Sequence, residues 1–217
     1  HGSSLKDVGN YLRLFNAACL HFQNLASTGR RPDIIGLEEC FNAMYTSSDI
    51  LRLRMECFIF NAKKVLPLQV TLSSPPFPPS KVKEEEPLLS LYRYLHRLLL
   101  EEQESDYSLL ENFMSEYATQ IHKDELHGIF GYLQNYAAMQ IRNGKESIFY
   151  EKAHHLNKFG LQHGFFSQSG IITHTQFTNI VTAACSAKDF DWAEDFILEH
   201  YHLLPENGRE DVLHLSD

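Results

Sequence analysis

The chain has 217 residues, of which 43% are hydrophobic, and it carries a formal net charge of −9. A chain of this length and apolar content can bury a core, which excludes wholesale disorder. No apolar run approaches the ~20 residues of a membrane-spanning helix. The acidic surplus lies after residue 86, where nine Lys and Arg face nineteen Asp and Glu, and this disfavours binding to a nucleic-acid backbone.

The first third of the chain contains helical patterns separated by turn residues. Val8, Leu12, Phe15 and Phe22 recur at helical spacing and form one apolar stripe. The segment Ser47-Ser48-Asp49 has the composition of a helix cap, which predicts that a new helix begins there. We therefore expect helices over Leu5–Ala26, Ile34–Tyr45 and Ile50–Val65.

A proline-rich and charged segment, SSPPFPPSKVKEEE, follows over residues 73–86. Four prolines in seven residues forbid a helix and favour an extended linker. The pattern predicts an N-terminal helical segment over 1–72 and a helical repeat region over 87–217. We interpret the first three residues, His-Gly-Ser, as the remnant of an expression tag. We expect the repeat region to continue beyond Asp217.

The region after the linker is helical to its end, with short connections that favour antiparallel neighbours. Glycines such as Gly144 and Gly164 act as helix stops. The expected helices are Leu88–Gln103, a helix that Ser105-Asp106 caps and that ends at Ile121, Asp124–Asn143 and Glu146–Gln162, followed by a hairpin over His174–Asn207. The fold class predicted is all-α.

The hairpin carries the most specific pattern in the chain. Apolar residues follow the i, i+3, i+4, i+7 rule in both of its halves, which are joined by a polar turn. A hairpin of this length cannot bury its apolar faces alone, so it implies neighbours of the same kind.

This spacing resembles the tetratricopeptide repeat. The positions that match its frame are Phe177, Ile180, Val181, Ala184, Ala193, Ile197 and Pro205. The repeat is degenerate, because Val181 stands where that family has glycine and Ala184 where it has an aromatic residue. The arrangement also resembles bacterial proteins of unassigned role built from such repeats. The resemblance implies an α-solenoid, a superhelix of stacked antiparallel hairpins.

The resemblance also implies a groove lined by the first helix of the hairpin. The groove-facing residues would be Thr175, Thr178, Asn179, Thr182 and Ser186. They are small, neutral and able to form hydrogen bonds. Tetratricopeptide domains that hold a peptide's C-terminal carboxylate use Lys, Arg and Asn at such positions, and only Asn179 is of that type. A carboxylate clamp is therefore not expected.

The same hairpin is similar to a pentatricopeptide repeat, an RNA-reading relative. In that family Thr178 and Asn207 would occupy the base-reading positions. The acidic charge of this region argues against the RNA-binding alternative.

A second alternative is a metal-binding or enzymatic helical domain, because ten of the twelve histidines follow residue 86. Glu151 and His154 form an ExxH pair, which places two ligands on one helix face, and Asp124 and His127 repeat the spacing. A di-iron site needs two such motifs and two more glutamates, and no HExxH occurs. We expect no metal, no cofactor and no catalytic residues.

The four cysteines lie among apolar neighbours and include no CxxC pair. They are Cys19, Cys40, Cys57 and Cys185. The pattern indicates buried thiols and a cytoplasmic location. Taken together, the sequence predicts a non-enzymatic protein–protein interaction scaffold, with a protein or peptide partner and no membrane segment.

Overall fold

The computed structural model describes residues 7–28, 34–65, 86–166 and 172–204. In these ranges the regular elements are helices, as the sequence predicted, and they number eight α-helices and one short 3-10 helix. The chain divides into two compact units, His1–Leu126 and His127–Asp217.

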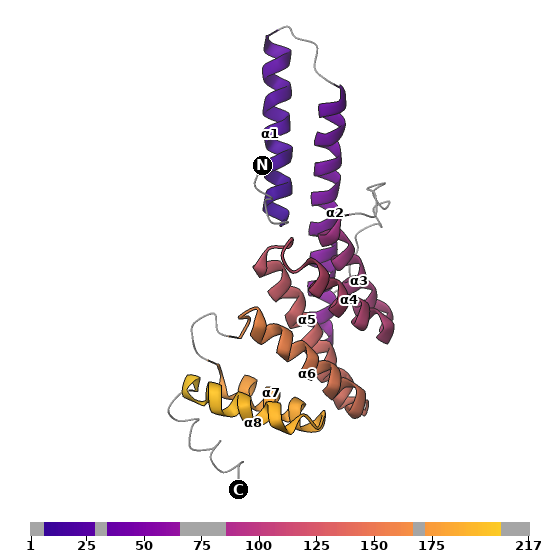
Figure 1. Ribbon diagram of the computed structural model, residues 1–217. Helices are drawn as coiled ribbons and strands as arrows, with labels where there is room; N and C mark the ends of the chain where they lie inside the picture. The colour runs from indigo at the N-terminus through magenta and orange to yellow at the C-terminus, as the bar shows by residue number, and fades with distance from the viewer. Residues whose placement is uncertain (1–6, 29–33, 66–85, 167–171, 205–217) are drawn as a thin grey trace. The chain divides into compact units, whose positions relative to one another are not determined.

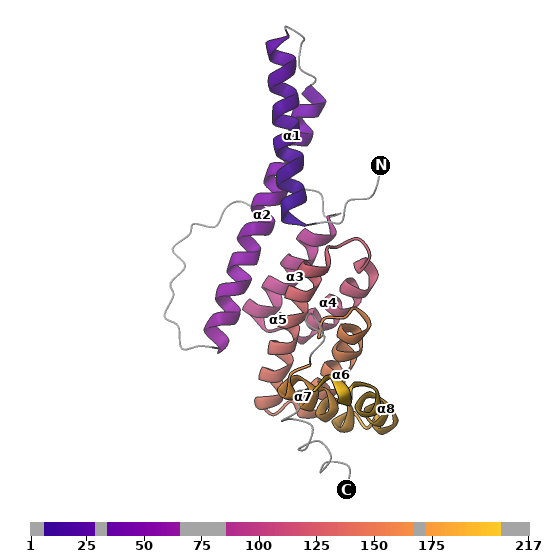
Figure 2. The same cartoon turned by 90° about the vertical axis from the view of Figure 1, so that its left-hand side faces the viewer.

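The first unit contains α1 (Val8–Ser27), α2 (Ile34–Val65), α3 (Pro87–Glu101) and α4 (Glu104–Tyr117). Each helix packs against the next one in the chain (Figure 1). Figure 2 shows α1 beside the first half of α2, and the second half of α2 beside α3. The core is built from buried side chains of three helices: Ile50, Leu53 and Cys57 of α2, Leu88, Leu91 and Leu95 of α3, and Tyr107, Leu110 and Met114 of α4.

The second helix corrects the sequence-based prediction. Ile34 to Val65 form one continuous helix of 32 residues, and the break predicted at Ser47-Ser48-Asp49 is wrong. Ser47 is buried, and its hydroxyl donates to the carbonyl oxygen of Ala43 at 2.8 Å. The side chain therefore bonds back into the preceding turn instead of capping a new one.

The chain reverses between α3 and α4 through Glu102, whose backbone is left-handed with a φ of 57°. The cap predicted at Ser105-Asp106 is wrong, because α4 begins at Glu104. Asp106 is buried and forms a two-pronged ion pair with Arg97 of α3, in which the guanidinium Nε donates to Oδ2 at 2.7 Å. This pair fastens α4 to α3.

The linker predicted over residues 73–86 lies outside the described residues, except for Glu86, and its extended conformation stays a prediction. The flanking helices α2 and α3 pack together in the first unit. Pro87 occupies the first turn of α3, where its missing N–H costs nothing.

The second unit contains most of α5 (Lys123–Arg142), all of α6 (Glu146–Gln162), α7 (His174–Ser186) and α8 (Phe190–His200), and η1 (Tyr201–Leu203). The bounds of α6 match the prediction at both ends. An aromatic cluster joins α5 to the end of α6, with the ring centre of Phe130 at 5.3 Å from those of Phe165 and Phe166. Gly160 of α6 faces these rings, and a Cβ there would lie 2.6 Å from Phe130 Cζ.

The predicted hairpin is present as α7 and α8. Thr173 begins it with a capping box, in which its hydroxyl accepts from the Gln176 N–H and the Gln176 side chain accepts from the Thr173 N–H. The turn passes through Lys188, at a φ of 62°. The rings of Phe177 and Phe196 meet across the hairpin at 5.1 Å. The helix α7 also packs against α6.

Candidate functional site

The candidate binding face lies on α7, and its residues occupy one side of that helix. Thr175, Asn179, Thr182 and Ser186 are exposed and Thr178 is half-buried. Their spacing of three, four and seven residues places them one above another on the helix. The opposite side of α7 is buried through Phe177, Ile180, Ala183 and Ala184. The helix therefore separates an apolar inner face from a neutral outer one.

The residues that define the repeat frame divide into three groups. Phe177, Ile180, Ala184 and Ala193 are buried, Val181 and Ile197 are half-buried, and Pro205 lies outside the described residues. The small Ala183, Ala184 and Ala193 let α7 and α8 approach closely. Thr178 is unusual, because its hydroxyl oxygen is buried and has no hydrogen-bond partner among the described residues.

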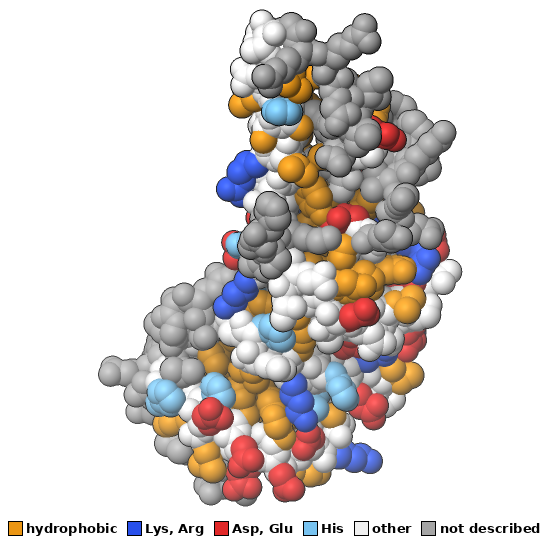
Figure 3. Space-filling view, turned by 45° about the horizontal axis from the view of Figure 1, so that its top comes forward, with side chains coloured by type: hydrophobic (Ala, Val, Ile, Leu, Met, Phe, Trp, Pro, Cys, Tyr) orange, Lys and Arg blue, Asp and Glu red, His pale blue; other side chains and the backbone are white. Residues whose placement is uncertain are grey.

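The two helices of the hairpin differ in charge. The helix α7 contains no Asp, Glu, Lys or Arg, whereas α8 exposes Asp191, Glu194, Asp195 and Glu199 and contains no Lys or Arg. Figure 3 shows the acidic side chains gathered over this part of the visible surface. The hairpin therefore exposes neutral hydrogen-bonding groups on α7 and negative charge on α8.

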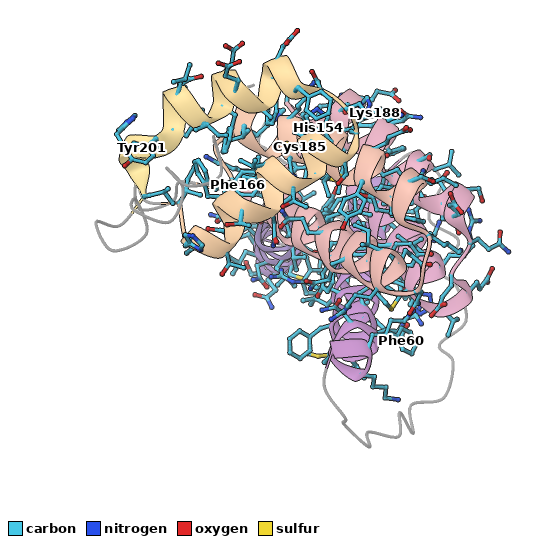
Figure 4. All side chains as sticks on the ribbon, turned by 90° about the horizontal axis from the view of Figure 1, so that it is seen from below. Phe60, His154, Phe166, Cys185, Lys188 and Tyr201 are labelled. Carbon is cyan, nitrogen blue, oxygen red and sulfur yellow. The ribbon has the colours of Figure 1, made fainter. Side chains whose placement is uncertain are left out.

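A polar cluster anchors the turn of the hairpin to α6. His154 Nε2 lies 2.9 Å from Asp189 Oδ2, and Lys158 Nζ donates to the same oxygen at 2.7 Å. The indole ring of Trp192 meets the His154 ring edge to face, with centres 4.7 Å apart, and Lys158 Nζ lies over the indole at 5.3 Å. Figure 4 shows His154 at the end of the hairpin where Cys185 and Lys188 lie, away from Tyr201.

The protonation states in this cluster follow from its contacts. The hydrogen bonds from Lys158 and His154 lower the pKa of Asp189 to about 2, so its carboxylate is ionised and only accepts hydrogen bonds. His154 Nε2 must therefore carry a hydrogen. Burial lowers the pKa of His154 from its usual value of 6.5, because desolvation outweighs the attraction of Asp189, so the imidazole is neutral at pH 7.

The cluster fits an anchoring role better than a catalytic one. The side chain of His154 is only 4% exposed, and its second nitrogen, Nδ1, is buried without a hydrogen-bond partner among the described residues. A general base must reach the proton that it removes, and bulk solvent does not reach this one. The cluster instead ties α6 to the start of α8.

The metal alternative receives no support from the described residues. His154, the histidine of the ExxH pair, bonds to Asp189, whereas Glu151 is exposed. Among the described residues no three His, Cys, Asp or Glu side chains gather as metal ligands would. None of the described helices has the length and hydropathy that crossing a membrane requires.

Sequence reasoning did not find Asp189 and Lys158. They are 31 residues apart, and no local pattern links a residue in a turn to one on an earlier helix. The only available signal was the position of Asp189 just before an expected helix, which indicates a cap and not an ion pair.

No family model, curated protein or solved structure matches the chain. The site must therefore be interpreted from its own geometry.

Proposed function

We propose that this protein is a non-enzymatic interaction scaffold, and that the α7 face binds a segment of a protein partner. In this proposal the α7–α8 hairpin is a degenerate tetratricopeptide-like unit stacked on α6 as in an α-solenoid. The observation that carries the proposal is the separation of α7 into a buried apolar side and an exposed side of neutral, hydrogen-bonding residues. Solenoid hairpins use such a side to bind extended peptides.

The chemistry of the face favours a particular kind of partner. Threonine, serine and asparagine side chains both donate and accept hydrogen bonds, which suits the backbone of an extended segment. The exposed carboxylates of α8 attract Lys or Arg and repel acidic groups. We therefore expect a partner segment that is polar or basic.

The same features disfavour the two alternatives. An RNA-binding face needs Lys or Arg for the phosphates, and the α7 face has neither. A catalytic role for the histidines lacks an accessible base at His154. The cytoplasmic location expected from the cysteines stays a prediction.

The test compares the wild-type protein with a double variant of the α7 face, Asn179→Arg with Thr182→Arg. Both residues are exposed, so the variant should fold, which circular dichroism and a melting curve can check. The arginines block the face and repel a basic partner. Affinity capture from an extract of the source organism, quantified by mass spectrometry, should show at least one protein whose recovery falls about tenfold.

The matched control is Asn112→Arg with Ser115→Arg, which makes the same kind of change at the same spacing on the exposed side of α4. The control should recover the partner as the wild type does. If all three proteins recover the same set, or if the α7 variant instead gains or loses RNA, the α7 face is not the site of a protein partner.

A further inference from the structure

The outward face of α2 carries a row of large apolar side chains that the described residues of its own unit leave exposed. The exposed residues of this row are Phe41, Tyr45, Leu51, Met55 and Phe58, with Ser48 among them. Tyr45 is 52% exposed and Met55 is 60% exposed. The buried side of the same helix, through Ala43, Ile50, Leu53 and Cys57, faces the opposite way. A contiguous apolar row of this kind usually marks an interface.

The charge around this row is unlike that of the rest of the chain. The helix α1 has Arg13 as its single charged residue, and α2 has four Asp or Glu against four Lys or Arg. The two helices together carry a net charge of +1, whereas the whole chain carries −9. Figure 3 shows mostly hydrophobic and uncharged side chains on α1. Two copies of this acidic protein can therefore approach at α1 and α2 with less repulsion than elsewhere.

The positions of the row along α2 are spaced nearly alike in both directions, to within one residue. A two-fold axis between the two copies, at right angles to α2 and level with the midpoint between Asp49 and Ile50, makes the two α2 helices antiparallel. This axis places Phe41 level with Phe58 of the second copy, and Ser48 level with Leu51 of the second copy. Tyr45 and Met55 of the second copy also fall level, to within about one residue's rise of ~1.5 Å.

The ends of the row are complementary in the same arrangement. Glu38 is exposed at one end and Lys63 is exposed at the other. In an antiparallel pair Glu38 lies level with Lys63 of the second copy, to within about two residues or ~3 Å. The small Ser48 at the centre allows the two helices to approach closely. A self-complementary surface is what an isologous two-fold interface requires.

We propose that the protein forms a two-fold homodimer through the outward face of α2, with the two α2 helices antiparallel and Tyr45 against Met55 of the second copy. The large apolar residues of the row exclude water at the centre, and the Glu38–Lys63 pairs fix the register at the ends. This interface is independent of the α7 face, so either proposal can fail without the other.

The test uses two single variants whose charges are opposite, Tyr45→Arg and Met55→Glu. Each should weaken self-association about a hundredfold, because it buries an unpaired charge twice in the dimer. A mixture of the two variants should associate again, because the heterodimer pairs Arg at 45 with Glu at 55 at one site and restores the wild-type contact at the other. Sedimentation equilibrium of the full chain measures each mass.

The control is Leu109→Glu, which changes an apolar residue of α4 that is 45% exposed and lies off the row. This variant should dimerise as the wild type does, and circular dichroism should show all variants folded. A wild-type protein that sediments as a monomer at high micromolar concentration overturns the proposal. So does a dimer that both single variants leave intact, or a folded pair of variants that stays monomeric when mixed.

Discussion

At the scale of single residues, Gly160 shows most directly how packing overrides local preference. Replacing an exposed helical glycine by alanine normally stabilises a helix by about 1 kcal/mol. At Gly160 the new Cβ would lie 2.6 Å from Phe130 Cζ and 2.8 Å from Phe166 Cε2. Because both rings are buried, Gly160→Ala should lower the free energy of unfolding by about 1–3 kcal/mol in urea denaturation.

The control for this prediction is Gly131→Ala in α5. A Cβ at Gly131 meets nothing within 4 Å, so only the helix preference of alanine acts, and the free energy of unfolding should rise by about 0.5–1 kcal/mol. Changes of opposite sign in the free energy of unfolding of the two variants would show that the effect at Gly160 comes from the aromatic cluster. A stabilising Gly160→Ala would mean that Phe130 and Phe166 move aside freely.

The imidazole of His154 gives a prediction about pH. Burial lowers its pKa, so the folded state disfavours the protonated form. The unfolded chain then binds more protons as the pH falls below the usual value of 6.5, and the protein loses stability in that range. His154→Gln keeps a donor for Asp189 but does not titrate. The variant should lose less stability than the wild type between about pH 8 and about pH 5.

The measurement is the free energy of unfolding in urea at several pH values for both proteins. The eleven other histidines are common to both proteins, so the difference between the two curves isolates His154. Above about pH 7 the curves should run parallel. Parallel curves below that pH as well would show that His154 keeps an ordinary pKa in the folded protein.

Ion pairs such as those of Asp189 and Asp106 could not be predicted from the sequence. Helical spacing correctly predicted burial at Phe177, Ile180 and Ala193 of α7 and α8. Residue type predicted a helix cap at Asp106, although this residue pairs with Arg97. Burial follows from a helical period, whereas an ion pair between two elements depends on where tertiary packing places them.

At the scale of elements, α2 shows that the polar triplet Ser47-Ser48-Asp49 does not end a helix. Ser48 is exposed in the middle of the continuous helix. Proline there would remove a backbone hydrogen bond and clash with the preceding turn, so Ser48→Pro should cost about 3 kcal/mol. Proline at the start of a new helix would instead be tolerated.

Thermal melting followed by circular dichroism distinguishes the two cases, with Ser48→Ala as the control that keeps the helix intact. A melting temperature unchanged by Ser48→Pro would support the helix break predicted from Ser47-Ser48-Asp49. The sequence misled here because these residue types favour caps when they are exposed. In the folded protein α1 and α3 pack on α2 at either side of the triplet, and Ser47 satisfies its hydroxyl on the Ala43 carbonyl.

Other elements could be predicted well because their signals are local. The bounds of α6 follow from Gly144 and Gly164, both of which adopt a positive φ. The capping box of α7 could also have been found, because Thr173 and Gln176 have its spacing. The apolar row of α2 was not found, because two short helices in place of one hid its continuity.

At the scale of the whole molecule, the net charge of −9 opposes self-association, and the proposed dimer makes the sign of the salt effect testable. Long-range repulsion between two acidic chains is screened by salt, with a Debye length of about 10 Å at 0.1 M. Contacts between apolar side chains are not weakened by screening. Because the α2 row is mainly apolar, raising the salt concentration should strengthen the dimer.

Sedimentation equilibrium at about 0.05 M and about 0.5 M NaCl measures this effect directly. We expect the dissociation constant to fall several-fold at the higher concentration. An interface held mainly by Glu38–Lys63 pairs would respond in the opposite way, because salt screens attraction as well as repulsion. Lys63→Ala separates the two contributions: it should leave the apolar association in place and keep the same sign of salt dependence. A dimer that dissociates as salt rises would assign the association to charge pairs and not to the apolar row.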